Sequence, residues 1–111
     1  MFKFLIIAVF FIGTTTYAQQ NQHEQRITLT EITASPNPFS DTTYISFESS
    51  KPQDVVFIVK NVLHDTVHHE LYFAIKGINR IRFSRKTLKP GMYFYMLKTG
   101  DEVITKRLVI K

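Results

Sequence analysis

Short runs of alternating apolar and polar residues, separated by turn residues, fill the chain from Ile27 to Lys111. The turn residues recur at intervals of about 8–12 residues, which is typical of β-sandwiches and barrels. Alternation with a period of two sends successive side chains to opposite faces of a strand. No stretch carries the period of about 3.6 residues that marks an amphipathic helix. The pattern therefore predicts an all-β domain.

Seven strands are expected, and turn residues separate them. The prolines of Ser35-Pro36-Asn37-Pro38 lack backbone donors and end the first strand. Pro90-Gly91 begins the sixth strand, and Thr99-Gly100-Asp101-Glu102 predicts a hairpin into the seventh. Seven antiparallel strands in a domain of this size favour an immunoglobulin-like β-sandwich. The expected strands cover residues 27–32, 42–47, 55–59, 67–73, 77–83, 92–97 and 103–110.

The same alternation predicts which side chains face the core. Ile45 and Phe47 share the inward face of the second strand. The expected inward side chains of the third strand are Val55, Phe57 and Val59. Hydrophobicity places Val67, His69, Leu71 and Phe73 of the fourth strand inward, and His68, Glu70 and Tyr72 outward.

The first eighteen residues have the features of a secretory signal peptide. Lys3 supplies the positive charge, residues 4–12 are apolar but too few to span a bilayer, and Thr16-Tyr17-Ala18 offers a cleavage site after Ala18. An uncleaved anchor is the alternative. We expect a signal peptide at 1–18, a polar lead-in at 19–26 and one domain at 27–111, with Sec export to the periplasm.

The absence of cysteine excludes lipid attachment and disulfides, so the domain must be held by packing and sheet hydrogen bonds. Removal of Lys3 lowers the formal net charge from +5 to +4. The charge is uneven, because residues 76–111 carry +8 and residues 19–75 carry −4. Two readings stay open: an anionic partner for the C-terminal half, or the solvated faces of strands. Nucleic acid is not expected as the partner of an exported protein whose aromatic residues alternate as core residues.

Metal and cofactor sites are not expected. His64, Asp65, His68 and His69 are common ligand types, but adjacent histidines on a strand point to opposite faces and cannot chelate one ion together. Tyr93, Phe94 and Tyr95 fit core and cross-strand packing better than a ligand-binding patch.

No enzymatic activity or small-molecule substrate is expected either. The chain has no cysteine nucleophile, no Gly-x-Ser-x-Gly turn, no His-Glu-x-x-His and no phosphate-binding glycine loop. Asp101 and Glu102 are neighbours in the sequence, but the side chains of adjacent hairpin residues usually diverge into solvent. They are therefore not expected to act as an acid–base pair.

Four segments, in order, resemble the C-terminal sorting domain of the type IX secretion system. They are Ser35-Pro36-Asn37-Pro38-Phe39, residues 55–67, Leu88-Lys89-Pro90-Gly91-Met92-Tyr93 and Lys106-Arg107-Leu108-Val109-Ile110-Lys111. The family motif residues are Pro36, Asn37, Pro38, Gly91 and Tyr93. The resemblance runs from about Ser35 to Lys111. Two departures stand out: Lys60-Asn61 replaces the usual tyrosine-aspartate pair, and His64 replaces a turn glycine, which predicts a reshaped or mildly strained turn.

The resemblance implies a route and its partners. Such domains, found in Bacteroidetes, are read by an outer-membrane translocon after Sec export. A sortase-like protease then removes them and joins the cargo to anionic lipopolysaccharide at the cell surface, or the cargo is secreted. Only a short polar segment precedes the domain here, so we expect either a free-standing module or a remnant.

The recognition surface is expected at the basic terminal strand, formed by Lys106, Arg107, Leu108, Val109, Ile110 and Lys111. Its apolar residues can dock in the sheet while its charges stay exposed. The alternative is a free-standing structural or adhesive β-sandwich that binds a surface polymer or another envelope protein.

Overall fold

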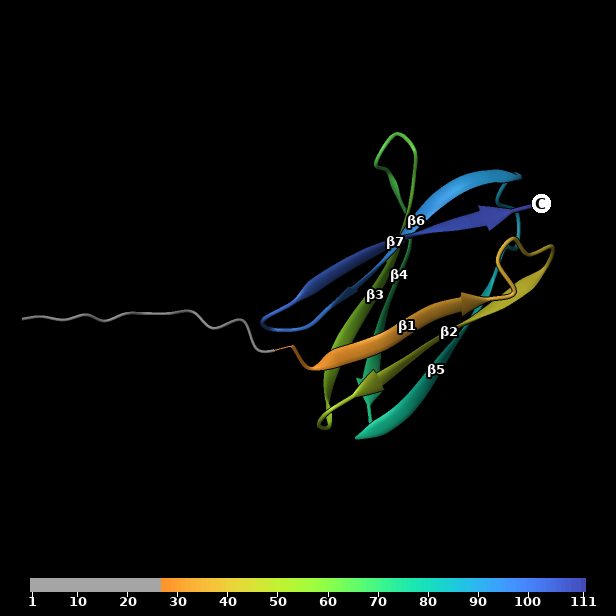
Figure 1. Ribbon diagram of the computed structural model, residues 1–111. Helices are drawn as coiled ribbons and strands as arrows, with labels where there is room; N and C mark the ends of the chain where they lie inside the picture. The colour runs from red at the N-terminus through yellow and green to blue at the C-terminus, as the bar shows by residue number, and fades with distance from the viewer. Residues whose placement is uncertain (1–26) are drawn as a thin grey trace, which may run out of the picture.

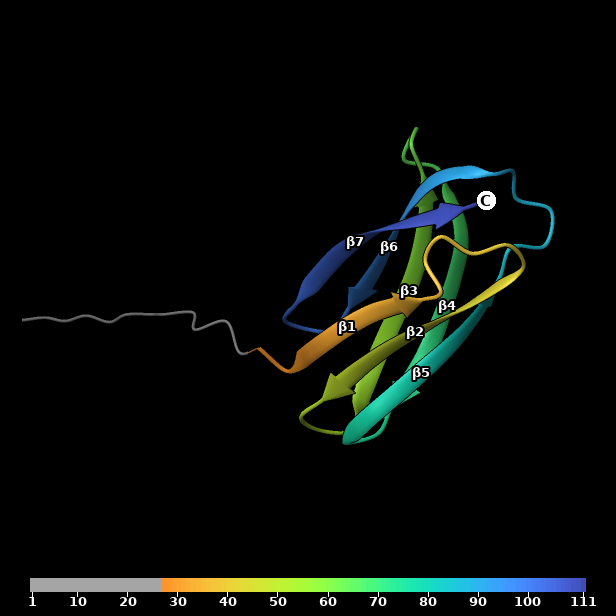
Figure 2. The ribbon, with the colours of Figure 1, turned by 45° about the vertical axis from the view of Figure 1, so that its right-hand side comes forward.

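Residues 27–111 are described by a computed structural model, which has seven strands in two antiparallel sheets (Figures 1 and 2). The strands are β1 Leu29–Ser35, β2 Thr42–Ser49, β3 Gln53–Asn61, β4 Thr66–Ala74, β5 Gly77–Ser84, β6 Gly91–Lys98 and β7 Val103–Ile110. The all-β prediction and the seven strands are confirmed. The signal peptide and lead-in predicted for residues 1–26 lie outside the described residues. Within residues 27–111, no helix is long and apolar enough to cross a membrane.

The two sheets differ in size. One has three strands in the order β1-β2-β5, and the other has four in the order β4-β3-β6-β7. The pairing of β2 with β5 is unbroken from Thr42 opposite Ser84 to Ser49 opposite Gly77. Along the chain, β1 and β2 build one sheet, β3 and β4 the other, and the chain then returns once to the first sheet with β5.

The core lies between the sheets. Val55, Phe57 and Val59 of β3 are fully buried, as the alternation predicted, and so are Ile45 and Phe47 of β2. The Phe57 ring packs edge-on against the Phe83 ring of the opposite sheet, with 5.8 Å between centroids. Edge-to-face aromatic pairs of this kind add to the free energy of burial alone.

A bulge in β1 places Leu29 and Ile32, which are three residues apart in the sequence, on the same face of the strand. Leu29 and Ile32 are both buried, although strict alternation would separate them. The register with β2 shifts between Thr30 and Thr33, and Glu31 has a φ of 54°. The extra residue of a bulge resets the alternation, so both apolar side chains reach the core.

The inward face predicted for β4 is wrong. Tyr72 pairs with Val55, Glu70 with Phe57 and His68 with Val59, so this face of β4 points to the core. The His68 ring lies 5.1 Å from the Phe83 ring and 5.5 Å from the Phe57 ring.

Leu71 and Phe73 are instead 52% and 69% exposed. Val67 is the extra residue of a bulge opposite the step from Val59 to Lys60, and it packs against the core. It is therefore the one residue of the predicted inward set that packs there. The register with β3, rather than hydropathy, set the face of β4.

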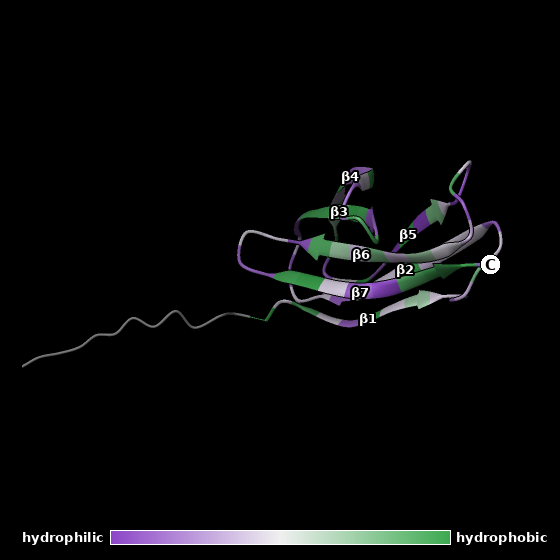
Figure 3. Ribbon diagram, turned by 90° about the horizontal axis from the view of Figure 1, so that it is seen from above, coloured by the Kyte–Doolittle hydropathy of each residue, from purple (hydrophilic) through white to green (hydrophobic). Residues whose placement is uncertain are grey.

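The outer faces of the two sheets also differ. On the three-stranded sheet, polar side chains alternate outward along β2 and β5, and the Arg80 guanidinium lies 4.4 Å over the Tyr44 ring. Figure 3 shows that β3 is largely hydrophobic, whereas β7 has a hydrophilic stretch between two hydrophobic ends. The hydrophilic stretch of β7 includes Lys106 and Arg107.

Candidate functional site

The predicted recognition strand is β7, at one edge of the four-stranded sheet. Leu108 and Ile110 are buried in the core, and Val109 is half-buried. The side chains of Lys106, Arg107 and Lys111 are exposed. The strand thus combines a buried apolar anchor with basic side chains at the surface.

The Pro36-Asn37-Pro38 segment lies along the free edge of β7. The Asn37 side chain donates from Nδ2 to the Arg107 carbonyl (3.1 Å), and its Oδ1 accepts from the Val109 amide (2.9 Å). A side-chain amide has one carbonyl and one NH₂ group, so it can replace the backbone of a neighbouring strand. The loop of Asn37 and the end of β7 lie side by side in Figures 1 and 2.

Phe39 continues the same edge with its backbone. Its amide donates to the Val109 carbonyl (3.0 Å), and its carbonyl accepts from the Lys111 amide (2.8 Å). Phe39 itself is buried, and its ring packs edge-on against Phe83. The segment is held in place by Thr43, whose hydroxyl donates to the Pro36 carbonyl (2.6 Å). The outward backbone groups of this edge from the Arg107 carbonyl to the Lys111 amide are therefore used within the domain.

The other two motif residues lie on the opposite side of β7. Gly91 pairs with Ile110, and Tyr93 pairs with Leu108. Gly91 has a φ of 148°, a conformation that side chains with a Cβ rarely adopt. The Tyr93 hydroxyl donates to the Lys89 carbonyl (2.7 Å) and closes the turn that leads into β6. Motif residues far apart in the sequence thus flank one strand.

Arg85 fixes the last described residue, a role that sequence reasoning missed. Its guanidinium donates from Nη1 to the carbonyls of Lys111 (3.2 Å) and Ser40 (3.3 Å). Its Nε donates to the Leu88 carbonyl (3.1 Å). One planar guanidinium therefore joins three loops, which suits its fixed fork of donors. No local sequence signal distinguishes this arginine from the other bases of the region.

Two side chains join β7 and its hairpin to β1. Lys106 donates from Nζ to the Ile32 carbonyl (2.9 Å), so this predicted recognition residue bonds within the domain. Glu102 accepts from the backbone amide and the hydroxyl of Thr28. Glu102 therefore does not diverge into solvent as expected for a hairpin carboxylate, because β1 brings donors within reach; Asp101 is exposed.

An open groove of about 540 Å³ runs between β1 and β7. Its lining includes Asn37, Lys106 and Arg107, three of the residues that sequence analysis singled out. Tyr95 lies at its inner side, and burial raises the pKa of Tyr95 to about 12. The groove gives the basic strand a concave surface.

The three histidines within residues 27–111 are not brought together. His68 packs against core rings and lies 2.9 Å from Glu70, whereas His69 is exposed on the other face. His64 lies in the β3–β4 turn. Across residues 27–111, no group of three or more His, Asp or Glu side chains is placed to hold a metal ion.

The β3–β4 turn keeps a glycine-like conformation despite its two departures from the family. His64 has a φ of 70°. Asn61, which stands in place of the family aspartate, accepts at Oδ1 from the amides of Leu63 (2.9 Å) and Asp65 (3.0 Å). His64 therefore has the mild backbone strain that the sequence predicts for a histidine in place of a turn glycine.

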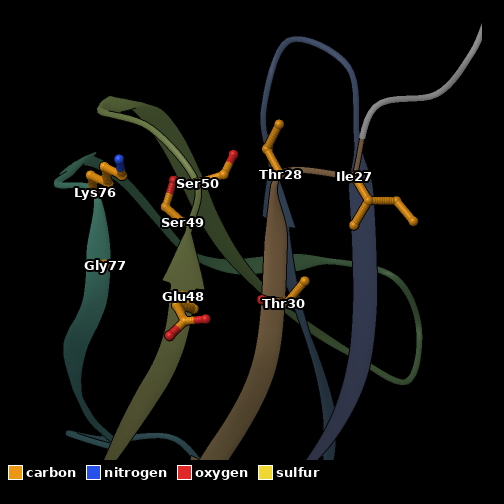
Figure 4. Close-up of a pocket in the computed structure, with 8 residues that line it drawn as sticks. All are labelled: Ile27, Thr28, Thr30, Glu48, Ser49, Ser50, Lys76 and Gly77. Carbon is orange, nitrogen blue, oxygen red and sulfur yellow. The ribbon is translucent and has the colours of Figure 1, made fainter.

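Two further depressions each measure about 330 Å³. One lies at the end of the three-stranded sheet, where Figure 4 shows Ser49 and Ser50 between the start of β1 and the Lys76-Gly77 corner. The other lies on the outer face of the four-stranded sheet, near Phe94 and Met96. Neither depression brings together a set of side chains that catalysis or metal binding would require.

The domain aligns with parts of several solved structures of much larger enzymes. They include β-glucosidases from Erythrobacter marinus (TM-score 0.49, 9% identity, 75% of this chain and 15% of that chain) and Bifidobacterium adolescentis (0.45, 12%, 75% and 17%). A β-glucosidase from Listeria innocua gives a TM-score of 0.42 at 11% identity, covering 72% and 16%. The chain spans about a sixth of their length. Likeness at this level carries no argument about function. No curated protein matches the chain significantly.

Residues 33–111 match the family described as the secretion system C-terminal sorting domain. The match covers well over half of the chain and includes every motif residue that flanks β7. The chain therefore belongs to the secretion system C-terminal sorting domain family, whose members are sorting signals for type IX secretion.

Proposed function

We propose that the type IX outer-membrane translocon binds this domain at the β7 edge, over the groove that β7 forms with β1. The observation that carries this proposal is the pair of hydrogen bonds in which the Asn37 side chain donates to the Arg107 carbonyl and accepts from the Val109 amide. They make the motif and the basic strand one rigid unit. A preorganised surface loses little conformational entropy when it binds.

Charge at this edge supports an acidic partner surface. Arg107 and Lys111 present exposed cationic groups, whereas Lys106 reaches across the groove to β1. Residues 76–111 carry a formal charge of +8, which favours encounter with an anionic surface. Anionic lipopolysaccharide is the acceptor to which the cargo would be joined.

The strand order supports an immunoglobulin-like topology for the domain. In this arrangement the fourth strand joins the sheet of strands 3, 6 and 7 rather than the sheet of strands 1, 2 and 5. The proposed route is Sec export to the periplasm, binding to the translocon, passage across the outer membrane and removal by the sortase-like protease. The protein would then reach the cell surface or the medium.

A surface-display assay tests the proposal. Residues 19–111 are fused behind a Sec-exported reporter in a type IX-competent host, since β1 begins before the family match and Thr28, which contacts Glu102, lies outside it. The parent fusion should reach the surface. Arg107→Gln with Lys111→Gln should retain the reporter in the periplasm, while the matched change Lys76→Gln with Arg82→Gln on the other sheet should not. Exposed substitutions alter stability by no more than about 0.5 kcal/mol each, so folding is preserved and is checked by circular dichroism.

Two outcomes would count against the proposal. A folded Arg107 and Lys111 variant that still reaches the surface would place recognition elsewhere on the sandwich. A parent fusion that stays in the periplasm would favour the adhesive or structural module. Lys106 is left unchanged in this test, because its bond to the Ile32 carbonyl would confuse binding with stability.

A further inference from the structure

Exposed apolar side chains gather along β4 and its two connecting turns. Five of the nine large hydrophobic residues that are exposed within residues 27–111 belong to this region. They are Val62, Leu63, Leu71, Phe73 and Ile75. In Figures 1 and 2 the β3–β4 hairpin projects at one end of β4, and the β4–β5 turn lies at the other. Both ends and the middle of this strand are therefore apolar.

The strand is also an open edge. β4 pairs only with β3, so every second residue turns its backbone N–H and C=O away from the sheet. The Asn61 amide donates to the Asp65 carbonyl (3.0 Å), so the backbone groups of Asn61 face β4. Because β3 is continuous from Gln53 to Asn61, the backbone groups of its other odd-numbered residues also face β4 by alternation. Their partners on β4 are His68, Glu70 and Tyr72. His69, Leu71 and Phe73 therefore direct their backbone groups to the free edge.

β4 lacks the features that usually protect an edge strand from pairing with another chain. Proteins blunt edge strands with outward charges, prolines or a covering segment. β7 is covered by Asn37 and Phe39, and β5 carries Arg80 and Arg82. The one charged residue of β4 is Glu70, which lies on the inner face beside His68. Another strand can therefore approach β4 without meeting an outward carboxylate or ammonium.

We propose that β4 is the contact surface for a second copy of this chain, paired antiparallel with its own β4 about a two-fold axis. Centred on Leu71, this pairing places His69 opposite the partner's Phe73 and Glu70 opposite the partner's Tyr72. It also brings the hairpin residues Val62 and Leu63 of one copy toward the Ile75 corner of the other. The two apolar ends thus cover each other, and no like charges meet.

Self-complementarity distinguishes a second copy from an acidic partner. An acidic surface would be attracted to the basic β7 edge, whereas β4 contains no Lys or Arg. An isologous interface needs a patch that fits itself, and this strand supplies it. A single strand pair with its apolar ends should bury an area at the low end of the roughly 1,200–2,000 Å² that stable interfaces bury. The dimer should therefore dissociate on dilution. It leaves the β7 edge free, so it does not depend on the translocon proposal.

Disulfide trapping tests the pairing and its register. The chain has no cysteine, so Leu71→Cys introduces a single thiol. Directly paired residues that exchange hydrogen bonds have Cα atoms about 5.5 Å apart, which suits a disulfide. The matched control is Val103→Cys, which is 59% exposed on the β7 edge. Leu71→Cys should oxidise to a covalent dimer on the order of tenfold faster than Val103→Cys, because the dimer raises the effective thiol concentration.

Sedimentation equilibrium of the signal-free protein gives the second readout. The parent should be a concentration-dependent dimer, Leu71→Lys should be a folded monomer, and Val103→Lys should dimerise like the parent. The proposal is overturned by a parent that is monomeric at millimolar concentration, by equal oxidation of the two cysteine variants, or by a dimer that survives Leu71→Lys. Binding of another protein to β4 without self-association would be one way to reach the first of these outcomes.

Discussion

The two edges of the four-stranded sheet differ in how far their outward backbone groups are hydrogen-bonded within the domain. At the C-terminal half of β7, the Asn37 side chain and the Phe39 backbone satisfy the outward backbone groups from the Arg107 carbonyl to the Lys111 amide, and exposed side chains such as Arg107 remain for a partner. At β4, the backbone groups remain open, and the outward side chains Leu71 and Phe73 are apolar. A closed edge can be recognised through charge and shape, whereas an open edge can accept another strand. One small domain thus presents two chemically distinct surfaces on opposite sides.

Both edges rest on one core, and Phe57 lies near its centre. Its ring contacts the rings of Phe83, Tyr95 and His68. Phe57→Ala should lower the free energy of unfolding by about 3–5 kcal/mol, because it removes a fully buried side chain and leaves a cavity. Urea denaturation measures the loss. A midpoint equal to that of the parent would refute a core shared by the two edges.

The β7 side should weaken at alkaline pH. Burial raises the pKa of Tyr95 from 10.0 to about 12. Below pH 10 the phenol is protonated in the folded and unfolded chains, so its contribution is fully present. Between pH 10 and 12 only the unfolded chain ionises, and about 2–3 kcal/mol of stability is lost. Denaturation in urea across this range should show a shallower decline for Tyr95→Phe. Parallel declines for the two proteins would contradict the shift.

Removing the cover of the β7 edge should have a smaller effect. Asn37→Ala deletes two hydrogen bonds to β7 and should cost about 1–2 kcal/mol. Hydrogen exchange at the Val109 amide should accelerate beyond the global change, because that amide loses its acceptor. Asn37→Asp keeps an acceptor for the Val109 amide, so its exchange rate at this amide should lie between those of the parent and Asn37→Ala. Unchanged protection at Val109 would show that Asn37 does not close this edge.

On the β4 side, the turn at His64 should tolerate glycine. His64 has a φ of 70°, which costs a residue with a Cβ roughly 1–2 kcal/mol relative to glycine. Glycine loses more backbone entropy on folding, so His64→Gly should stabilise by up to about 1 kcal/mol. Val62→Gly in the same turn should destabilise, since Val62 has no positive φ. Destabilisation by both glycines would mean that the His64 side chain contributes contacts beyond its conformation.

The alternation predicted the strands well where a strand has one buried face. The seventh strand was expected at residues 103–110 and lies at Val103–Ile110. The motif residues were also identified from the sequence, through its resemblance to a known family. Their common role around β7 was not predicted, since Asn37 and Val109 are separated by many residues and meet only through the fold.

The face of β4 marks the limit of sequence reasoning. Hydropathy favoured Leu71 and Phe73 as core residues, but the register with β3 turned His68 and Tyr72 inward, where their rings pack against Phe57 and Phe47. Alternation divides a strand into two faces, but it cannot say which face a neighbouring strand will bury when both contain rings.

The sequence by itself therefore determined the strand content and the turns, because those depend on local periodicity and backbone conformation, and its motif segments indicated the family by resemblance. Only the tertiary structure decided the face of β4, the Arg85 and Glu102 contacts and the closing of one edge. Each of these depends on which segments the sheets bring together.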